Sequence, residues 1–209
     1  MRTSRRNGFT LIEMLTVIVI IAVILGIGLP AFTNLMKSGG LSGASREVAN
    51  ALGLARQYAI THRTTTRIVF PYSGTIGTTV SATNLCPWYQ SYAVLDIGST
   101  NYVSKWDHLP LGTVFMCDSV LLGSGTHPCL DTLTLASLPF PNTNSSSAML
   151  AYIEFNPTGA ASNPGTLTIT EGFMSGTNVV PTSKTSTSLV NSAIISVDNV
   201  IGRIQVTRP

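Results

Sequence analysis

The residues near the N-terminus that could do chemistry are Gly8, Phe9 and Glu13. Glu13 is the single acid in a long apolar run, and a carboxylate within a membrane helix costs about 3 kcal/mol. Cleavage between Gly8 and Phe9 would create an α-amine about one helical turn from Glu13. That amine could neutralise Glu13 of its own chain or of a neighbouring copy, which would fix packed chains in register. A carboxylate that stays hydrated at the membrane interface is the alternative interpretation.

Other residue types that support catalysis or metal binding are scattered along the chain. Asp107 precedes His108, but neighbours in a strand face opposite ways, so they form no proton relay. His127 and Cys129 flank a proline but lack a third and a fourth metal ligand. No serine lies in a nucleophile-elbow pattern, and the aspartates are too dispersed for a calcium loop. We therefore expect no catalytic residue, no metal site and no cofactor.

Three cysteines follow the apolar run, namely Cys86, Cys117 and Cys129. If this part of the chain is exported, it enters an oxidising compartment where one disulfide can form. Three pairings exist, and each leaves one thiol over. We favour Cys117 with Cys129, because they are closest in sequence and flank a loop rich in Gly, Ser and Pro. Three buried free thiols are the alternative.

The net charge of the chain depends on its first residues. The 209 residues carry twelve Lys and Arg and nine Asp and Glu, a formal net charge of +3. Arg2, Arg5 and Arg6 precede Gly8, so their removal leaves nine basic against nine acidic residues. Nonspecific nucleic-acid binding depends on neutralising phosphates, so a neutral chain does not favour nucleic acid as a partner.

An uncharged stretch from Met14 to Met36 is long enough to cross a bilayer, because a spanning helix takes about 20 apolar residues. Since the arginines lie on its N-terminal side, we expect that end to stay cytoplasmic and the rest to be exported. Residues 1–8 are the expected leader and 9–36 the transmembrane and assembly helix. Pro30, preceded by two nearby glycines, is expected to bend this helix at the membrane surface.

Residues 37–63 are expected to form a glycine-interrupted linker and then an amphipathic helix. Each glycine costs about 1 kcal/mol in a helix interior, so Lys37–Ser45 is predicted to kink or to form a short loop. Ser45 is a candidate cap for the restarted helix. An apolar stripe at three- and four-residue steps predicts docking on a sheet, with the arginines of the segment pointing elsewhere. The stripe consists of Val48, Ala51, Leu52, Ala55 and Ala59.

Residues 64–209 change to a period of two, which predicts an antiparallel β-domain. The alternating runs are TTRIVFPY, YAVLDI, MLAYIEF, TLTIT, AIISV and RIQVT. In YIEF, Ile153 and Phe155 should share one face and Tyr152 and Glu154 the other. Clusters of Gly, Ser, Asn and Pro between the runs predict turns and loops. The expected fold class is α+β, with a long N-terminal membrane-spanning helix packed on an antiparallel β-sheet domain.

The segment GFTLIEMLTVIVIIAVILGIGLP resembles the N-terminal signal of type IV pilins and type II secretion pseudopilins. The resemblance implies that a prepilin peptidase cuts after Gly8 and methylates the new N-terminal residue, Phe9. It also matches Glu13 and Pro30 to the assembly glutamate and the helix-bending proline of the family. Residues 37–45 depart from the pattern, since family members usually carry an unbroken helix there.

Three later stretches, WDHLPLGTV, FNPTG and ISVDNVIGRIQVT, are similar to the GspH/FimT family of minor pseudopilins and minor pilins. The DNA-binding branch of that family ends in Gly-Arg-x-Arg. Here Gly202 and Arg203 are followed by Ile204 and Gln205, so the second arginine is missing. The candidates for a DNA contact that the resemblance implies are Arg203 and Arg208, which lie near one another at the end of the sequence. With the second arginine missing, Arg203 is interpreted as a hairpin residue that meets solvent or a carboxylate.

The resemblance implies a structural subunit and not an enzyme: a minor pseudopilin in the periplasmic pseudopilus of a type II secretion system. The alternative is a type IV pilus minor pilin involved in assembly, adhesion or DNA uptake. The implied partners are prepilin peptidase, other pseudopilins or pilins, and the inner-membrane assembly platform. The implied location is the inner membrane, crossed once with the C-terminal domain in the periplasm, and later a periplasmic filament.

Overall fold

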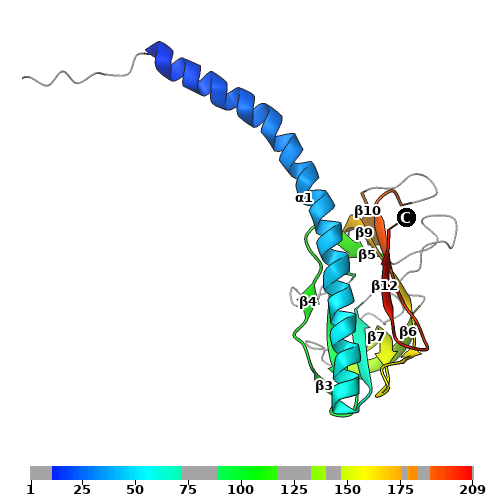
Figure 1. Cartoon of the computed structure of the whole chain (residues 1–209). Helices are drawn as coiled ribbons and strands as arrows, with labels where there is room; N and C mark the ends of the chain where they lie inside the picture. Colours follow the sequence, from blue (N-terminus) through cyan, green and yellow to red (C-terminus); the bar gives the residue numbers. More distant parts are fainter. Residues whose placement is uncertain are drawn as a thin grey trace, which may run out of the picture. The chain divides into compact units, whose positions relative to one another are not determined.

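The computed structural model describes residues 11–71, 89–116, 133–139, 147–175, 178–182 and 189–208, without the side chains of 27–39, 147–149 and 178. The chain forms two compact units, Met1–Gly39 and Gly40–Pro209. The first unit contains the N-terminal part of helix α1 (Leu11–His62), and the second contains the rest of α1 and all the strands (Figure 1).

Helix α1 runs through the segment Lys37–Ser45, where a kink or a loop was expected. Gly39, Gly40 and Gly43 all lie inside the helix, so they do not break it. The helix persists because Leu41 is buried in the core of the second unit, and tertiary packing outweighs the low helix propensity of glycine.

Ser45 does not cap a restarted helix, which corrects the sequence-based expectation. It lies inside α1 and is buried, and its hydroxyl donates a hydrogen bond to the backbone oxygen of Ser42 at 3.1 Å. A serine inside a helix commonly satisfies its hydroxyl in this way. The cap was predicted because the glycines before it suggested a helix start.

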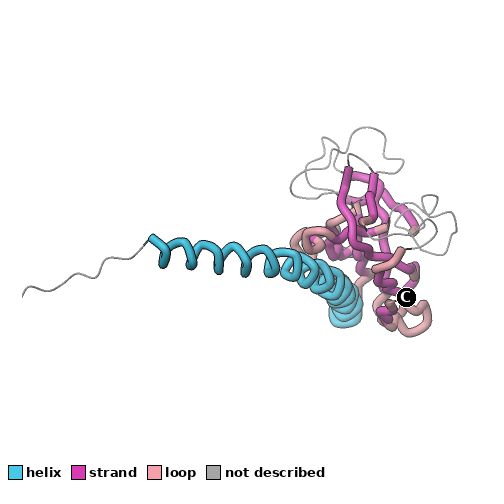
Figure 2. The backbone as a smooth tube through the Cα atoms, turned by 90° about the horizontal axis from the view of Figure 1, so that it is seen from above, coloured by secondary structure: helices cyan, strands magenta, loops and turns pink. Residues whose placement is uncertain are grey.

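The predicted apolar stripe of α1 is confirmed. Val48, Leu52, Ala55 and Ala59 are fully buried, and Ala51 packs against the same core from a half-buried position. Four of these side chains are alanine or valine, so the strands approach the helix axis closely. The stripe fixes which face of α1 the β-strands cover (Figure 2).

The first sheet has the strand order β3-β2-β1-β7-β6, with β4 paired to β2 and β8 paired to β7. All of its described pairings are antiparallel. Its strands are β1 (Thr66–Phe70), β2 (Ser91–Asp96), β3 (Asn101–Tyr102), β4 (Asp107–His108), β6 (Thr134–Pro139), β7 (Ser147–Phe155) and β8 (Ala161–Asn163).

The second sheet has the order β10-β9-β11-β12, with β5 paired to β9, and it is also antiparallel in its described pairings. Its strands are β5 (Thr113–Phe115), β9 (Thr166–Ser175), β10 (Asn178–Pro181), β11 (Ser192–Val197) and β12 (Ile204–Thr207). The antiparallel β-domain was therefore predicted correctly in kind, but it consists of two sheets.

The main hydrophobic core joins α1 to both sheets. Leu52 of the helix, Ile153 of the first sheet and Ile169 of the second are fully buried members of one cluster. A second, smaller cluster lies on the other face of the first sheet and contains Val69, Leu95 and Leu150. The central strands of the first sheet are therefore covered on both faces, which explains why β2 is buried along its whole length.

The predicted alternation in YIEF is confirmed. Ile153 and Phe155 belong to the main core, whereas Tyr152 belongs to the second cluster. Glu154 shares the Tyr152 face and forms an ion pair with Arg67, the residue directly opposite on β1, with Arg67 Nε and Glu154 Oε2 2.7 Å apart. The Arg67 guanidinium also lies 4.2 Å from the centroid of the Tyr152 ring.

Two predicted loops contain strands. Ala161–Asn163, expected as loop, forms β8, and Asn178–Pro181 forms β10. The FNPTG turn therefore returns the chain to its own sheet through β8 and does not lead directly into β9. Both segments lack the β-branched alternation of the longer strands. They form strands because each pairs with a long neighbouring strand, β8 with β7 and β10 with β9.

Within the part of the chain that the structure describes, no helix is both long enough and apolar enough to span a lipid bilayer.

Candidate functional site

Glu13 lies in the first turn of α1, and its side chain is exposed. Its backbone oxygen accepts a hydrogen bond from the Thr16 hydroxyl at 2.9 Å. The positive end of the helix dipole favours an acidic residue in the first turn. Because the Glu13 side chain is exposed there, it can pair with a positive group that approaches the N-terminal end of the helix.

The side chains of residues 11–26 are all exposed, although most are large and apolar. Leu11 is 85 % exposed and Ile18 is 66 % exposed. Large apolar side chains of this kind are usually buried in a soluble domain. Such a continuous apolar surface marks an interaction with lipid or with another protein. This part of α1 is therefore an interaction surface.

Several predicted site residues lie outside the description. Gly8 and Phe9 precede the described residues, and Cys117 and Cys129 fall between described segments, as does Cys86. Pro30 lies within α1, but its side chain is not described. The cleavage site, the methylation site, the bend at Pro30 and the disulfide stay predictions.

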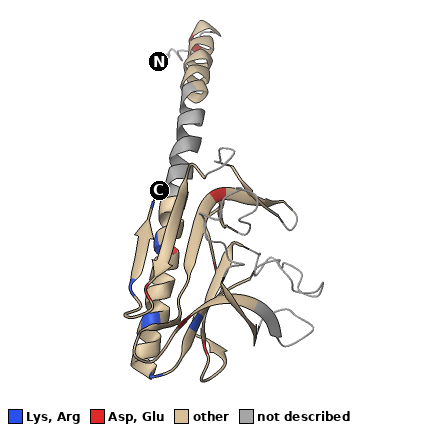
Figure 3. Cartoon of the chain, turned by 90° about the vertical axis from the view of Figure 1, so that its right-hand side faces the viewer, with Lys and Arg blue, Asp and Glu red and all other residues tan. Residues whose placement is uncertain are grey.

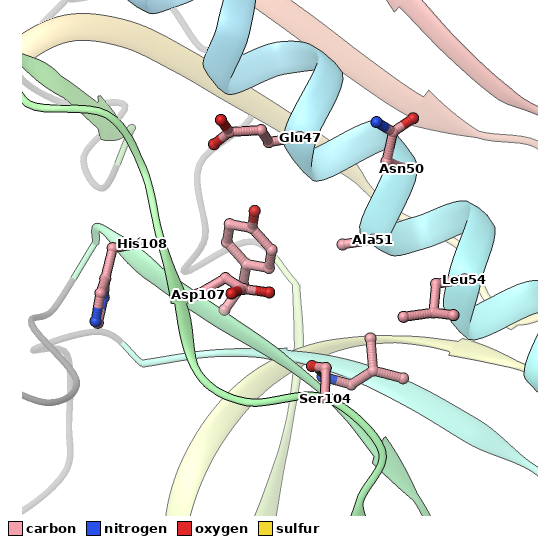
Figure 4. Close-up of a pocket in the computed structure, with 9 residues that line it drawn as sticks. Glu47, Asn50, Ala51, Leu54, Ser104, Asp107 and His108 are labelled. Carbon is pink, nitrogen blue, oxygen red and sulfur yellow. Dashed lines mark hydrogen bonds between the residues drawn. The ribbon is translucent and has the colours of Figure 1, made fainter.

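A concave site, which we call the acidic pocket, lies in the second unit between α1 and the segment around β2 and β4 (Figure 4). Its volume is about 620 Å³. The helix contributes residues at three- and four-residue spacing, which places them on one face. The lining residues are Glu47, Asn50, Ala51, Leu54, Tyr92, Val94, Ser104, Asp107 and His108.

The pairing of β2 with β4 places Tyr92, Asp107 and His108 side by side in the lining of the acidic pocket. Tyr92 lies opposite Asp107 in the antiparallel register, and Ser91 lies opposite His108. Tyr92 is 3 % exposed. Burial, and after it the negative charges of Asp107 and Glu47, together raise the pKa of Tyr92 to about 12. Both carboxylates thus act on the Tyr92 hydroxyl in the same direction as its burial.

Asp107 and His108 do not form a proton relay with a nucleophile. They are adjacent in β4, and Ser91 Oγ and His108 Nδ1 are within hydrogen-bonding distance at 3.1 Å. A serine nucleophile needs a base that is itself oriented by a third group, and no hydrogen bond joins Asp107 to His108 among the described residues. Over the same residues, no group of three or more His, Cys, Asp or Glu could hold a metal ion.

Arg56 connects α1 to two turns of the second unit. Its Nε donates a hydrogen bond to the backbone oxygen of Gly159 at 3.0 Å. Gly159 belongs to the FNPTG turn, and Gly202 of the β11–β12 hairpin lies against the same carbonyl oxygen. Both glycines have positive φ, 82° and 63° respectively. The glycine of the Gly-Arg pair is therefore explained by its positive φ and by its close packing on Gly159.

The two candidate DNA contacts are separated by β12. Arg203 is exposed next to Gly202, where its backbone oxygen accepts a hydrogen bond from the Asp198 amide at 2.9 Å. Arg208 follows the other end of the four-residue strand, and its Nη2 donates to Ser42 Oγ at 2.6 Å. Charged residues are sparse over the second unit as a whole (Figure 3). The structure therefore does not bring Arg203 and Arg208 together into one basic patch.

Asp96 holds the turn after β2 and has a structural explanation. Its carboxylate accepts hydrogen bonds from the Thr64 hydroxyl at 2.6 Å, the Ser99 hydroxyl at 2.7 Å and the Gly98 amide at 3.0 Å. Burial alone would raise the pKa of Asp96, but these hydrogen bonds lower it overall. This turn fastens the end of α1 to the first sheet.

Sequence reasoning missed the acidic pocket. Nothing in the sequence assigned Glu47 to a site, and Asp107 was considered only as the neighbour of His108 and as one of several dispersed aspartates. One signal was present in the sequence: Glu47, Asn50, Ala51 and Leu54 follow the spacing of one helix face, next to the buried stripe. The approach of Asp107 to that face depends on strand pairing, which the sequence pattern does not specify.

Two protein-family models match the chain. Residues 3–29 match the model of the prokaryotic N-terminal methylation motif, and residues 44–190 match that of the type II transport protein GspH. No curated protein matches the chain. The crystal structure of the type IV minor pilin FimU from Pseudomonas aeruginosa is 15 % identical, with a TM-score of 0.45. The match covers 84 % of this chain and 96 % of that one.

Proposed function

The chain belongs to the type II transport protein GspH family, and on this premise we propose that it is a minor pseudopilin in the periplasmic pseudopilus of a type II secretion system. The family is one of pilin-like structural proteins, so the chain is not an enzyme. Its N-terminal methylation motif implies processing by a prepilin peptidase and assembly with other pilin-like subunits.

The observation that carries the proposal is the combination of two patterns in one chain. A methylation motif over residues 3–29 precedes a GspH domain over residues 44–190. The exposed apolar side chains of residues 11–26 support it, because a helix with such a surface needs lipid or sister helices around it. The proposed membrane span is Met14–Met36, with the N-terminus in the cytoplasm and the second unit in the periplasm.

Assembly then consists of moving the apolar helix from lipid into a bundle of sister helices. Both surroundings are apolar, so this transfer gains little hydrophobic free energy, and packing and polar contacts must supply specificity. In the proposal, cleavage after Gly8 frees and methylates the amine of Phe9, which pairs with Glu13 of an adjacent subunit. Pro30 bends the helix at the membrane surface, and the inner-membrane assembly platform drives growth of the filament.

Mass spectrometry of the protein from its own cells tests the processing step. We expect an N-methylated Phe9 at the N-terminus, whereas a mature filament subunit that begins at Met1 would contradict it. Glu13→Ala should still be cleaved but should be absent from sheared or cross-linked filaments. Thr16→Ala is the matched control, because it changes a polar neighbour and leaves the carboxylate in place. Normal incorporation of the Glu13→Ala subunit would reject the pairing.

The second candidate function is that of a type IV pilus minor pilin in pilus assembly, adhesion or DNA uptake. It is favoured by the exposure of Arg203 in the β11–β12 hairpin. Deletion of the gene separates the two: a pseudopilin mutant retains exported proteins in the periplasm, and a pilus mutant loses surface pili. A salt-sensitive gel shift that Arg203→Ala abolishes would support DNA uptake. The favoured Cys117–Cys129 disulfide is tested by non-reducing peptide mapping.

A further inference from the structure

We propose that the acidic pocket receives a lysine or arginine side chain of a neighbouring pilin-like subunit. The inference rests on the proposed function, since it names a contact that this subunit makes in its filament. It concerns the second unit alone and is separate from the pairing proposed for Glu13. The pocket combines two carboxylates, one tyrosine hydroxyl and an apolar wall, and each of these matches part of a long cationic side chain.

The charge of the pocket is negative and not neutralised. Glu47 comes from α1 and Asp107 from β4, and both side chains are exposed. Neither carboxylate has an ion-pair partner among the described residues, and no lysine or arginine lines the pocket. His108 is the remaining titratable lining residue besides Tyr92, and its Nδ1 faces Ser91 Oγ. A cation that enters the pocket is attracted by two negative charges, one from α1 and one from β4.

Tyr92 supplies a second, independent observation. Its side chain is 3 % exposed and lines the pocket next to Asp107, its partner in the strand register. A ligand that enters the pocket therefore meets the phenol as well as the two carboxylates. A guanidinium or ammonium group can donate a hydrogen bond to the hydroxyl oxygen. In Figure 4 the Glu47 and Asp107 side chains extend from α1 and β4 toward the space between these elements.

The wall of the pocket fits the alkyl stem of a basic side chain. Ala51, Leu54 and Val94 provide apolar contacts, and Leu54 remains 47 % exposed in the isolated chain. Lysine and arginine bury their methylene groups along such surfaces while the charged end reaches polar partners. The volume of about 620 Å³ lies within the range of binding pockets and leaves room for the backbone that carries the side chain.

Other ligand classes fit less well. Calcium takes six to eight oxygen ligands, whereas the pocket offers two carboxylates, and its donor set contains no cluster suited to a metal ion. Phosphate or nucleic acid would be repelled by Glu47 and Asp107. An apolar helix alone would leave both carboxylates without an opposite charge. A cationic side chain supplies one.

Site-specific photo-cross-linking in the cells that assemble the filament tests the proposal. A benzoyl-phenylalanine replaces Leu54 at the pocket wall, and a second variant carries it at Ile18 on the apolar helix as a reporter of assembly. We expect the Leu54 position to yield an adduct with a pilin-like subunit, mapped by mass spectrometry to a peptide next to a lysine or arginine. The combined substitution Glu47→Gln and Asp107→Asn should lower that adduct at least tenfold and leave the Ile18 adduct unchanged.

The outcomes separate this inference from the proposed function. An Ile18 adduct without a Leu54 adduct overturns the pocket inference and leaves the filament role intact. A Leu54 adduct whose yield is unaffected by the two neutral substitutions overturns the charge pairing. If neither position yields an adduct, both proposals fail. A matched gain-of-function variant, Asn50→Asp, adds a third carboxylate to the pocket and should raise the Leu54 adduct.

Discussion

Gly202 packs directly on the backbone of Gly159, so that a Cβ at position 202 would collide with the carbonyl oxygen of Gly159. The same carbonyl accepts the hydrogen bond from Arg56 Nε at 3.0 Å. The helix, the β7–β8 turn and the β11–β12 hairpin therefore meet at one point. Gly202 also has a φ of 63°, a conformation that side chains rarely adopt.

The first prediction is that Gly202→Ala lowers the free energy of unfolding by about 2–4 kcal/mol, through the backbone strain plus the collision. Gly112→Ala is the matched control, because Gly112 has a φ of 84° but nothing within 4 Å of the added carbon. It should cost about 1 kcal/mol, the strain alone. Urea unfolding of the full chain in detergent measures both, and equal losses would contradict the collision.

The second prediction concerns the titration of Tyr92. Its pKa is raised to about 12, first by burial and then by Asp107 and Glu47. A raised pKa in the folded state stabilises the fold below the ordinary tyrosine pKa, and this stabilisation is lost as the pH rises toward 12. The ultraviolet titration difference between the wild type and Tyr92→Phe should show one late-titrating phenol. Glu47→Gln with Asp107→Asn should lower that pKa but keep it above 10, because burial remains.

The third prediction concerns acid stability and Asp96. Its pKa is lowered in the folded chain by hydrogen bonds that outweigh its burial. The stabilisation is therefore present above the unfolded pKa of about 3.9 and is lost as the pH falls below it. Between pH 5 and pH 2.5, the melting temperature of the wild type should fall further than that of Asp96→Asn. Equal slopes for the two proteins would show that Asp96 does not couple folding to protons.

The fourth prediction concerns Arg67 and Glu154, whose side chains are 20 % and 16 % exposed. Arg67→Met leaves the Glu154 carboxylate largely buried without its partner, which should cost about 1–3 kcal/mol. Replacing both residues by Met removes the stranded charge and should recover part of that loss. A double-mutant cycle on urea unfolding measures the coupling. Additive losses would mean that the pair contributes no interaction energy.

The longer elements were predictable from the sequence because a single physical pattern specifies each one. Ile68, Ile153 and Ile195 each lie at a buried position of a β-branched run that alternates with a period of two. The strands that contain them, β1, β7 and β11, formed where they were expected. The division into two sheets was not predictable. β9 begins three residues after β8 ends, yet it pairs with β11 and β5. The period of two describes which faces are buried and not which partner a strand chooses.

The sites differ in how local they are. The cleavage motif and Glu13 are contiguous, so the sequence alone indicates them. The acidic pocket joins Glu47 to Asp107, which are sixty residues apart in sequence. The two carboxylates face one pocket only because β4 pairs with β2. The helical continuity through Gly40 was missed for the same reason, because packing of Leu41 into the core overrides a local propensity.

The hydrogen bond between Arg208 and Ser42 places the two chain ends of the second unit side by side. The FNPTG turn instead contacts α1 at Arg56, fourteen residues further on, which is about 21 Å along the helix axis. A fluorescent protein fused after Pro209 would therefore crowd the end where the helix enters the unit. A small dye attached at the exposed Thr158 would project from the far end without adding residues to the turn that contacts Arg56, and it is the better label for imaging the subunit.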